Sequence, residues 1–393
     1  MSYEQLNIVV KTSEKFRKYY LFKGNELRAS SLYSQLENGL DVTYKSKDII
    51  GNEYINSNLE SSFEHFIDKL KSEKWLKDDN LIDSIGIRLQ APSSLFLDDC
   101  LLDESKISVL ENLRQYNPTL LDHQLSTIHT IRRRLKNVKI LGISDSKYHK
   151  NKPPKAWNSG IDLYLADNLD IKRFGYLGLS TEYIVQLLKN DLPDRLIICY
   201  IGESGISLTA VKKGTSIENS MGYTPNDGLF SFVGSGNVDY SAIRKMKDYM
   251  NLSDYDMTLH LNSYSGLKGL SRQSSNLEEV YSSAKNNIPE SKLAINTFVY
   301  ELQKQIGSMV AALGGIDCLV FTGSIGTASA WLRKAVVKDL QCFGLLIDDA
   351  KNAKQLTKKK IIEIHKRTRV NEILVIESKD EYLIAQKTKS YRS

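Results

Sequence analysis

The sequence predicts an α/β fold built from two similar halves. Short apolar runs typical of buried strands alternate with helical spacing along the chain, which indicates layers of helices on mostly parallel sheets. A strand hairpin opens near Leu6 and another near Arg195, and each is followed by helices and later strands. With 393 residues, the chain is long enough for two domains, or for one large body divided by a cleft. We therefore expect an internal duplication.

The most informative stretch runs from Gly314 to Arg333. Residues 317–321 are expected to form a buried strand, the glycine-rich residues 322–326 a turn, and residues 328–337 a helix. Backbone N–H groups at a helix start after such a turn often bind an anion, and glycine lets a ligand approach the backbone. Ordinary packing of a strand against a helix explains the same pattern, so the stretch needs support from elsewhere.

The remaining elements of the N-terminal half follow from apolar spacing and from turn residues. Lys23-Gly24-Asn25-Glu26 is the turn of a hairpin, and Asn117-Pro118 ends a helix because proline cannot continue one. The polar segment 33–58 receives no element. The expected strands are 6–10, 18–22, 27–33, 84–90 and 138–143, and the expected helices are 63–75, 107–116 and 120–135.

In the C-terminal half, residues 194–201 give the longest buried-strand signal and lead directly into Gly202-Glu203-Ser204-Gly205. Helices are expected at 176–188 and 301–313. The other expected strands are 207–212, 215–219, 342–347 and 372–376, with 382–387 as one more.

Composition and charge exclude several classes of protein. Apolar residues make up 41% of the chain and the net charge is only +6, so we read the basic clusters at 132–134 and 358–360 as solvated helix faces and expect no nucleic-acid partner. No apolar run approaches the length of a membrane span. The four cysteines lack metal-ligand spacing and look like thiols in a reducing compartment. The cytoplasm is the expected location.

Several segments resemble acetate kinases in the same order and at similar spacing. The longest is 294–333, in which FTGSIGTAS resembles the FTGGIGENS of that family. The others are Asn117-Pro118, Arg173-Phe174-Gly175-Tyr176, 220–225 with Gly228-Leu229, 235–239, 265–267 and 374–387. The resemblance covers nearly the whole chain. It implies a two-lobed actin/hexokinase-like fold, a duplicated ribonuclease H-like fold with a central cleft.

Acetate kinases transfer the γ-phosphoryl group of ATP to acetate, giving acetyl phosphate. The reaction needs in-line positioning, cations and donors around the phosphoryl group, Mg²⁺ on the phosphates and an arginine on the acceptor carboxylate. The resemblance thus implies ATP and Mg²⁺ as cofactors, a short-chain carboxylic acid as substrate and a homodimer. It also implies an acceptor-side lobe at 1–190, whose last helices can join the other lobe. The nucleotide-side lobe is 191–393, which carries the dimer contact and whose last segment, from about 374, returns to the first lobe.

The resemblance also assigns individual residues. Arg88 matches the arginine that binds the substrate carboxylate, and Asp145 matches the catalytic aspartate, with His149 just beyond it. Lys18 matches a lysine near the nucleotide phosphates. Asp380 stands where the family has a glutamate associated with Mg²⁺. The implied nucleotide contacts are Lys18, Gly202, Gly205, Gly323, Ser324, Ile325 and Gly326.

Other positions that the family uses are changed. Lys11 replaces an asparagine near the metal, Tyr116, Leu177 and Tyr200 each replace a histidine, and Gly234 replaces the arginine that stabilises the transition state. The first phosphate loop has become Ser13-Glu14-Lys15-Phe16, and the loop GESGIS has one extra residue. Asn276 and Glu278 replace an aspartate and an arginine. Five histidines, at 65, 123, 129, 260 and 365, have no counterpart and are interpreted as structural or surface residues.

Three hypotheses follow. The first is a divergent acetate kinase-like enzyme; the second is a catalytically reduced member that binds nucleotide, or nothing, and regulates or contacts another protein. The third is a kinase for a changed acceptor, for which Gly234 leaves space. Loss of one transition-state donor costs on the order of 10²–10³ in rate, so the changed positions favour the second hypothesis. Arg88, Asp145, Lys18 and Asp380 favour the first.

Overall fold

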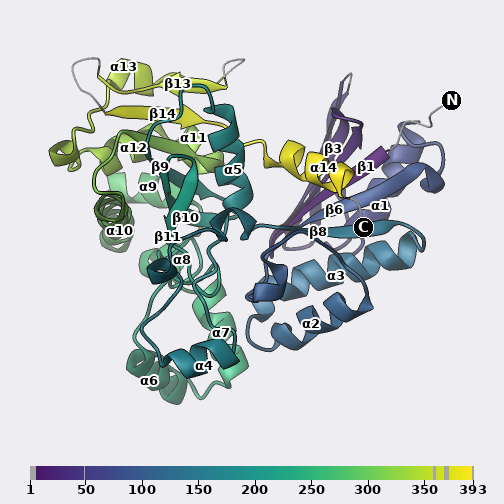
Figure 1. The fold of residues 1–393 in the computed structure, drawn as a ribbon, viewed down its shortest axis with the longest axis horizontal. Coiled ribbons are helices and arrows are strands. Elements are labelled where there is room, and N and C mark those ends of the chain that lie inside the picture. The colour runs from purple at the N-terminus through teal and green to yellow at the C-terminus, as the bar shows by residue number, and fades with distance from the viewer. Residues whose placement is uncertain (1–5, 48, 357–359, 367–370, 392–393) are drawn as a thin grey trace. The chain divides into compact units, whose positions relative to one another are not determined.

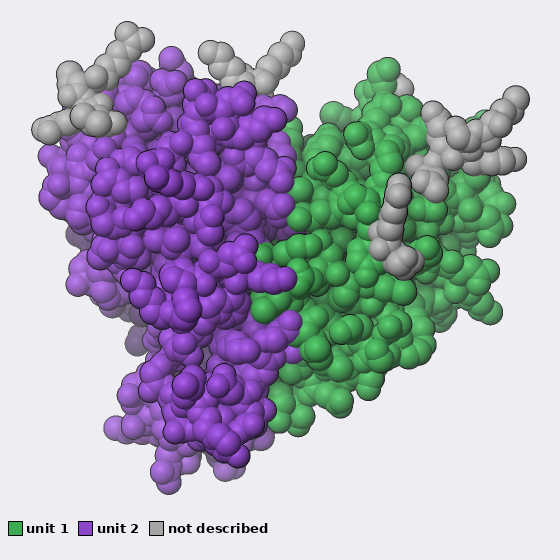
Figure 2. Space-filling view, viewed as in Figure 1, with its two compact units in different colours: residues 1–91, 95–147, 379–393 green, residues 92–94, 148–378 purple. Residues whose placement is uncertain are grey.

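The computed structural model describes residues 6–47, 49–356, 360–366 and 371–391. The chain forms two compact units (Figure 2). Unit 1 comprises residues 1–91, 95–147 and 379–393, and unit 2 comprises residues 92–94 and 148–378. Residues 148–190, whose helices the prediction allowed to join the second lobe, lie in unit 2, and the last helix lies in unit 1.

Within the described residues, unit 1 contains a sheet of eight strands in the order β5-β4-β3-β2-β1-β6-β8-β7. Strands β1, β6 and β8 run parallel to one another, and the other neighbours are antiparallel. The strands are β1 Leu6–Thr12, β2 Phe16–Lys23, β3 Glu26–Leu36, β4 Gly39–Ser46, β5 Ile50–Ile55, β6 Ile82–Leu89, β7 Cys100–Leu101 and β8 Lys139–Ser144.

Helices cover both faces of this sheet (Figure 1). They are α1 Ser62–Ser72, α2 Glu104–Arg114, α3 Pro118–Arg134 and α14 Asp380–Ser390. Ile85 and Ile87 of β6 join the core that α1, α2 and α3 complete. Gly86 between them faces the other way, where a side chain would collide with Thr388 of α14. A glycine in β6 therefore lets the last helix pack closely on the sheet.

The sheet of unit 2 has six strands within the described residues, in the order β11-β10-β9-β12-β14-β13. They are β9 Arg195–Gly202, β10 Gly205–Lys212, β11 Thr215–Asn219, β12 Cys318–Thr322, β13 Ile361–Glu363 and β14 Glu372–Ile376. Alternate residues of β9 face opposite layers: Ile197 faces α10, Pro289–Leu313, and Ile198 faces α5, Gly178–Leu187.

The two sheets repeat one topology. In each, a three-stranded antiparallel meander is continued by two parallel strands, as β3-β2-β1-β6-β8 in unit 1 and β11-β10-β9-β12-β14 in unit 2. The predicted α/β class and the internal duplication are confirmed. The other helices of unit 2 are α4 Leu163–Asn168, α6 Tyr240–Met250, α7 Asp254–Ser263, α8 Gly266–Ser271, α9 Leu277–Lys285, α11 Gly323–Ala328, α12 Ala330–Val337 and α13 Asp349–Asn352.

Four local expectations were wrong. Of the turn expected at 322–326, residue 322 ends β12 and residues 323–326 begin α11. Residues 382–387 lie in α14, where acidic residues at its start and lysines at its end favour a helix. Residues 342–347 are not a strand, because Gly344 takes a left-handed conformation (φ 74°) after the 3₁₀ helix Gln341–Phe343. The segment 33–58, to which we gave no element, completes β3 and forms β4 and β5.

The basic cluster on α3 is neutralised within unit 1. Arg132 pairs with Glu104, Arg133 with Glu64, and Arg134 with Asp79, as expected of a solvated helix face. Residues 358 and 359 of the second basic cluster lie outside the described residues. Among the described residues, no helix is both long and apolar enough to cross a bilayer.

Candidate active site

The functional residues predicted in unit 1 gather at one edge of its sheet. The carboxyl ends of the parallel strands β1, β6 and β8 meet there, which is where open α/β sheets bind ligands. Lys11 lies near the end of β1, Arg88 near the end of β6, and Asp145 directly after β8. The structure therefore brings these predicted residues to one place.

Arg88 and Asp145 form a buried ion pair. The Arg88 Nε atom lies 3.5 Å from the Asp145 Oδ2 atom, and the two side chains are only 5% and 1% exposed. Gln90 donates a hydrogen bond from Nε2 to the same carboxylate oxygen at 2.7 Å. The Asp145 carboxylate is thus fixed by two donors from β6 and its end, while its assigned catalytic role stays a prediction.

Helix α3 supports this site in a way that sequence analysis missed. Gln124 accepts a hydrogen bond from the Gln90 N–H at 2.9 Å and donates one to the Gln90 carbonyl at 3.0 Å. On the same helix face, His123 Nδ1 lies 2.9 Å from Thr12 Oγ1, and Thr127 accepts from Arg17 at 3.0 Å. Burial, then the charges of Arg17 and Arg88, hold the pKa of His123 well below its usual value, so it is neutral. Residues 123 and 127 are four positions apart, so they lie on one face of a helix. This spacing was the sequence signal that could have indicated their shared position.

The first loop of unit 1, residues 13–16, forms hydrogen bonds between its own backbone and side-chain groups. The Ser13 hydroxyl accepts from the N–H groups of Lys15 and Phe16 at 3.2 and 3.1 Å, and the Ser13 N–H donates to the Phe16 carbonyl. The Arg17 guanidinium binds the Ser13 and Phe16 carbonyls. Lys18, the predicted phosphate-binding lysine, lies over the Phe16 ring at 4.9 Å. These amides are therefore not directed at a ligand.

The predicted metal residue Asp380 contacts a cation from the protein itself. The Lys11 ammonium binds Asp380 Oδ1 and lies 3.9 Å from Glu381 Oε2. Burial raises the pKa of Glu381, and Lys11 opposes that rise. Among the described residues, no three His, Cys, Asp or Glu side chains form a cluster fit to hold a metal ion.

In unit 2, the two glycine-rich segments predicted to bind nucleotide lie together. Strands β9 and β12 pair up to Tyr200 and Thr322, so the segments that follow them are neighbours. A methyl group on Gly202 would lie 3.0 Å from the Ser324 nitrogen. Gly323 has φ 82° and leaves no room for a side chain against the Ile201 carbonyl. Both glycines therefore let the backbones of the two segments lie close to each other.

Arg333 holds the second of these segments, and its role was not predicted. Its guanidinium donates to the carbonyls of Gly326 and Thr327, at 2.9 and 2.8 Å, and to the side chain and backbone of Asn352. The side chain is buried, and burial lowers its pKa to about 10. Arg333 therefore satisfies the last carbonyls of α11 and joins it to α13.

Two of the changed family positions, Glu278 and Asn276, have structural roles of their own. Glu278 accepts hydrogen bonds from Ser329 and from Trp331, and Asn276 caps α9. Leu177 is buried with φ 60°, a conformation rare for leucine. Tyr116 is exposed, Tyr200 is half-buried, and a methyl group on Gly234 would meet nothing nearer than the Ser231 hydroxyl at 3.0 Å.

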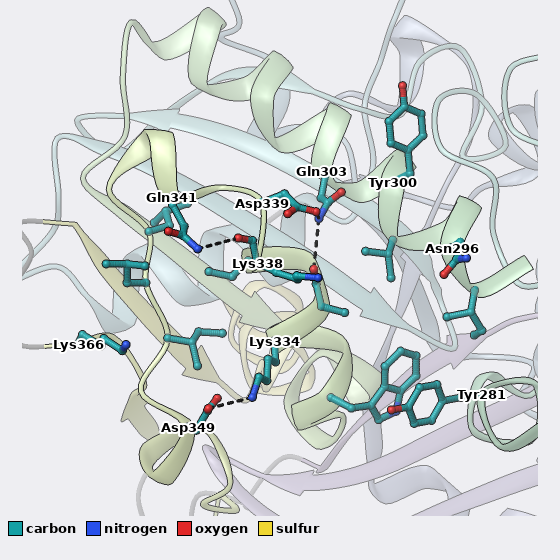
Figure 3. Close-up of a pocket in the computed structure, with 18 residues that line it drawn as sticks. Tyr281, Asn296, Tyr300, Gln303, Lys334, Lys338, Asp339, Gln341, Asp349 and Lys366 are labelled. Atoms are coloured by element: carbon teal, nitrogen blue, oxygen red, sulfur yellow. Dashed lines mark hydrogen bonds and ion pairs between the residues drawn. The ribbon is translucent and has the colours of Figure 1, made fainter. Parts of the chain in front are cut away.

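A pocket of about 690 Å³ lies elsewhere in unit 2 and is lined by none of the predicted site residues (Figure 3). Tyr281 stacks on Trp331 on its wall, with the ring centres 3.6 Å apart and the planes 2° from parallel. Lys334 on the same wall is paired with Asp349 at 2.9 Å.

His149, which follows Asp145, gives a prediction about acid stability. Its ring is fully buried; Nε2 donates to the Tyr176 carbonyl at 3.1 Å and Nδ1 accepts from Ser216 at 2.8 Å. Burial lowers the pKa of His149 from 6.5 to about 3. The neutral ring therefore contributes stability that is complete above pH 6.5 and is lost as the pH falls toward 3.

The expected loss from His149 is about 2 kcal/mol between pH 7 and pH 5. His149→Gln keeps polar contacts but cannot take up the proton. Urea unfolding at both pH values should therefore show a drop for the unchanged protein that is larger by about this amount than the drop for the variant. Equal drops would mean that His149 does not titrate with unfolding.

Known proteins resemble this chain over most of its length. The model of the Acetokinase family matches residues 28–386, which is most of the chain. The protein belongs to the acetokinase family. An acetate kinase from Thermoanaerobacter pseudethanolicus is 32% identical over 319 residues, covering 80% of this chain and 79% of that protein. A propionate kinase from Salmonella typhimurium is 30% identical over 310 residues, covering 78% and 75%.

The fold of this acetokinase family member also matches a solved structure. A propionate kinase from Francisella tularensis has a TM-score of 0.87 at 26% identity and covers 99% of this chain and 100% of its own. Together with the repeated sheets, this match confirms the predicted two-domain actin/hexokinase-like fold. The predicted resemblance to acetate kinases is likewise confirmed.

Proposed function

We propose that this acetokinase family member transfers the γ-phosphoryl group of ATP to a short-chain carboxylate such as acetate, forming an acyl phosphate. The supporting observation is the buried Arg88–Asp145 pair at the carboxyl edge of β6 and β8. A guanidinium is suited to bind a carboxylate with two hydrogen bonds. Asp145 and Gln90 hold this guanidinium and its surroundings in place before substrate arrives. The acetate and propionate kinases among its relatives support the same substrate class.

ATP is the proposed phosphoryl donor, and the paired segments around Gly202 and Gly323 are its proposed site. Their glycines let the two segments pack closely against each other, and glycine-rich segments of this kind can present backbone N–H groups to a phosphate. Magnesium, when bound to the phosphates, would neutralise charge on the transferred group. Lys18 remains the predicted phosphate residue. Asp380 stands where the resemblance implies a Mg²⁺-associated glutamate, and in this structure it is paired with Lys11. We also retain the homodimer and the cytoplasm as proposals; the four cysteines are free thiols.

A catalytically reduced, nucleotide-binding regulator is the second candidate. The hydrogen bonds within residues 13–16 favour it, because these backbone N–H groups donate to Ser13 and Phe16 rather than to a phosphate. The contact of Lys11 with Asp380 and the glycine at 234 favour it too. ATP binding is therefore expected to survive more readily than acetate phosphorylation.

Two measurements distinguish these candidates. Calorimetric titration with Mg-ATP should give binding, and Gly323→Ala should weaken that binding roughly tenfold or more, about 1.4 kcal/mol. Gly160→Ala is the matched control, because Gly160 has a similar φ of 68° but open space around it. A hydroxamate assay then detects acetyl phosphate or propionyl phosphate.

Acyl phosphate formation supports the kinase. Binding of ATP without any acyl phosphate supports the reduced regulator. Absence of ATP binding contradicts both candidates, and equal affinities of Gly323→Ala and Gly160→Ala mean that the nucleotide site is assigned to the wrong segment.

A further inference from the structure

The contact between Lys11 and Asp380 joins the two ends of unit 1. Lys11 comes from β1, and Asp380 and Glu381 begin α14, which packs on β1, β6 and β8. The three side chains are 13%, 3% and 14% exposed, respectively. Two carboxylates and one ammonium are thus held largely out of water at the carboxyl edge of the sheet.

This arrangement has an energetic reason. Removing charges from water is costly unless each charge is paired. Two adjacent acidic side chains at one helix start would also repel each other, and the Lys11 ammonium offsets that repulsion by contacting one carboxylate and lying 3.9 Å from the other. The Lys11 ammonium is therefore part of the packing of this corner.

A divalent metal at this corner would meet two obstacles. Magnesium prefers oxygen ligands in a strict octahedral geometry. A lysine ammonium carries only donors and has no lone pair for a metal. Its positive charge also repels a divalent cation that approaches the same carboxylate.

We propose that the Lys11 ammonium is a built-in cation that takes the place of a protein-held divalent metal at Asp380. Asp380 then serves as the partner of Lys11 and contributes no metal ligand. Any magnesium that reaches the site comes on the phosphates of the nucleotide. This inference rests on the proposed function in one respect. It takes Asp380 as the carboxylate at which a kinase of this family would hold magnesium. The positive charge of Lys11 thus lies at the edge of the sheet that also carries Arg88 and Asp145.

Manganese titration followed by electron paramagnetic resonance tests this without any nucleotide. The unchanged protein and Asp380→Asn should bind manganese equally weakly. Lys11→Asn frees both carboxylates and adds an amide oxygen, so it should gain one site at least roughly tenfold tighter, and the double variant Lys11→Asn/Asp380→Asn should lose it. Lys45→Asn, on the exposed part of β4, makes the same change in net charge and should gain nothing.

Stoichiometric manganese binding by the unchanged protein that Asp380→Asn removes would overturn the proposal. That comparison needs no Lys11 variant, so it decides the matter even where Lys11→Asn does not fold. Failure of a folded Lys11→Asn to gain a site would overturn it as well.

ATP titrations separate this inference from the proposed function. The ratio of ATP affinities with magnesium and with a chelator should be the same for the unchanged protein and for Asp380→Asn, and should rise in Lys11→Asn. A ratio that falls in Asp380→Asn overturns the inference while leaving the kinase intact. Absence of ATP binding under either condition overturns the proposed function, and the manganese result then decides the inference alone.

Discussion

Asp145→Asn is expected to lower the turnover of the proposed kinase by roughly 10²–10³, about 3–4 kcal/mol, without raising its KM for the carboxylate. Asparagine has the size of aspartate and accepts one of the present hydrogen bonds, but it lacks the charge that holds Arg88 at 3.5 Å. The guanidinium loses its anionic partner and is no longer held in the arrangement required for transfer.

The KM is expected to stay constant or fall, because an acceptor carboxylate no longer competes with Asp145 for Arg88. Arg88→Ala should do the opposite and raise the KM, since it removes the group that binds the carboxylate. Opposite effects of two neighbouring residues on KM are what a direct role in the reaction predicts. A purely structural pair would lower the amount of folded enzyme in both variants and leave both KM values unchanged.

Initial rates against carboxylate concentration, corrected for the folded fraction, measure both parameters. Asp122→Asn is the matched control, because Asp122 lies on α3 of the same unit and pairs only at the surface with Arg114. Turnover by Asp145→Asn within about twofold of the control would mean that the reaction takes place elsewhere. Loss of a catalytic group should raise the activation free energy by about 3–4 kcal/mol, which is far more than a twofold change.

The strands that carry Arg88 and Asp145 were predictable because burial imposes a strong local pattern. Residues 84–90 and 138–143 are short apolar runs, and the structure has β6 and β8 there. The rule that parallel strands end at one edge then brings Arg88 close to Asp145. The glycine-rich segments after β9 and β12 followed in the same way, from the buried strands that precede them.

Contacts made by polar side chains across long sequence separations were not predictable. Gln124 is 34 residues from Gln90 in sequence, and nothing near either residue indicates that α3 lies beside the end of β6. Strands β4 and β5 were missed because β5 is the edge of the sheet and β4 lies next to it, and both carry polar residues, at 51–53 and 43–46. The Lys11–Asp380 contact spans 369 positions and depends on the packing of α14 against Gly86.

Arg333→Met is expected to lower the free energy of unfolding by about 3 kcal/mol or more. Arg333 is the donor to carbonyls of Gly326, Thr327 and Asn352. Methionine fills part of the space but donates nothing, so these acceptors lose their partner inside the protein. Within the described part of the chain, no carboxylate pairs with the Arg333 guanidinium. Its contribution to stability therefore lies in the N–H groups that it donates at the ends of α11 and α13.

Arg333→Lys separates charge from geometry. Lysine keeps the positive charge but replaces the planar fork by a single ammonium, so it should recover only a part of the lost stability. Urea unfolding measures the difference, with Arg244→Met on the exposed face of α6 as the control. Full recovery in Arg333→Lys would assign the effect to charge. A loss in Arg333→Met no larger than in Arg244→Met would show that the carbonyls at the end of α11 find other partners.

Because Arg333 holds the end of α11, its replacement should also weaken nucleotide binding. The backbone from Gly323 to Gly326 is short, and its conformation depends on the strand before it and the arginine behind it. In Arg333→Met, ATP affinity is therefore expected to fall under conditions in which the protein is still fully folded. Unchanged ATP affinity in the folded variant would restrict Arg333 to a role in stability, and would place the nucleotide away from α11.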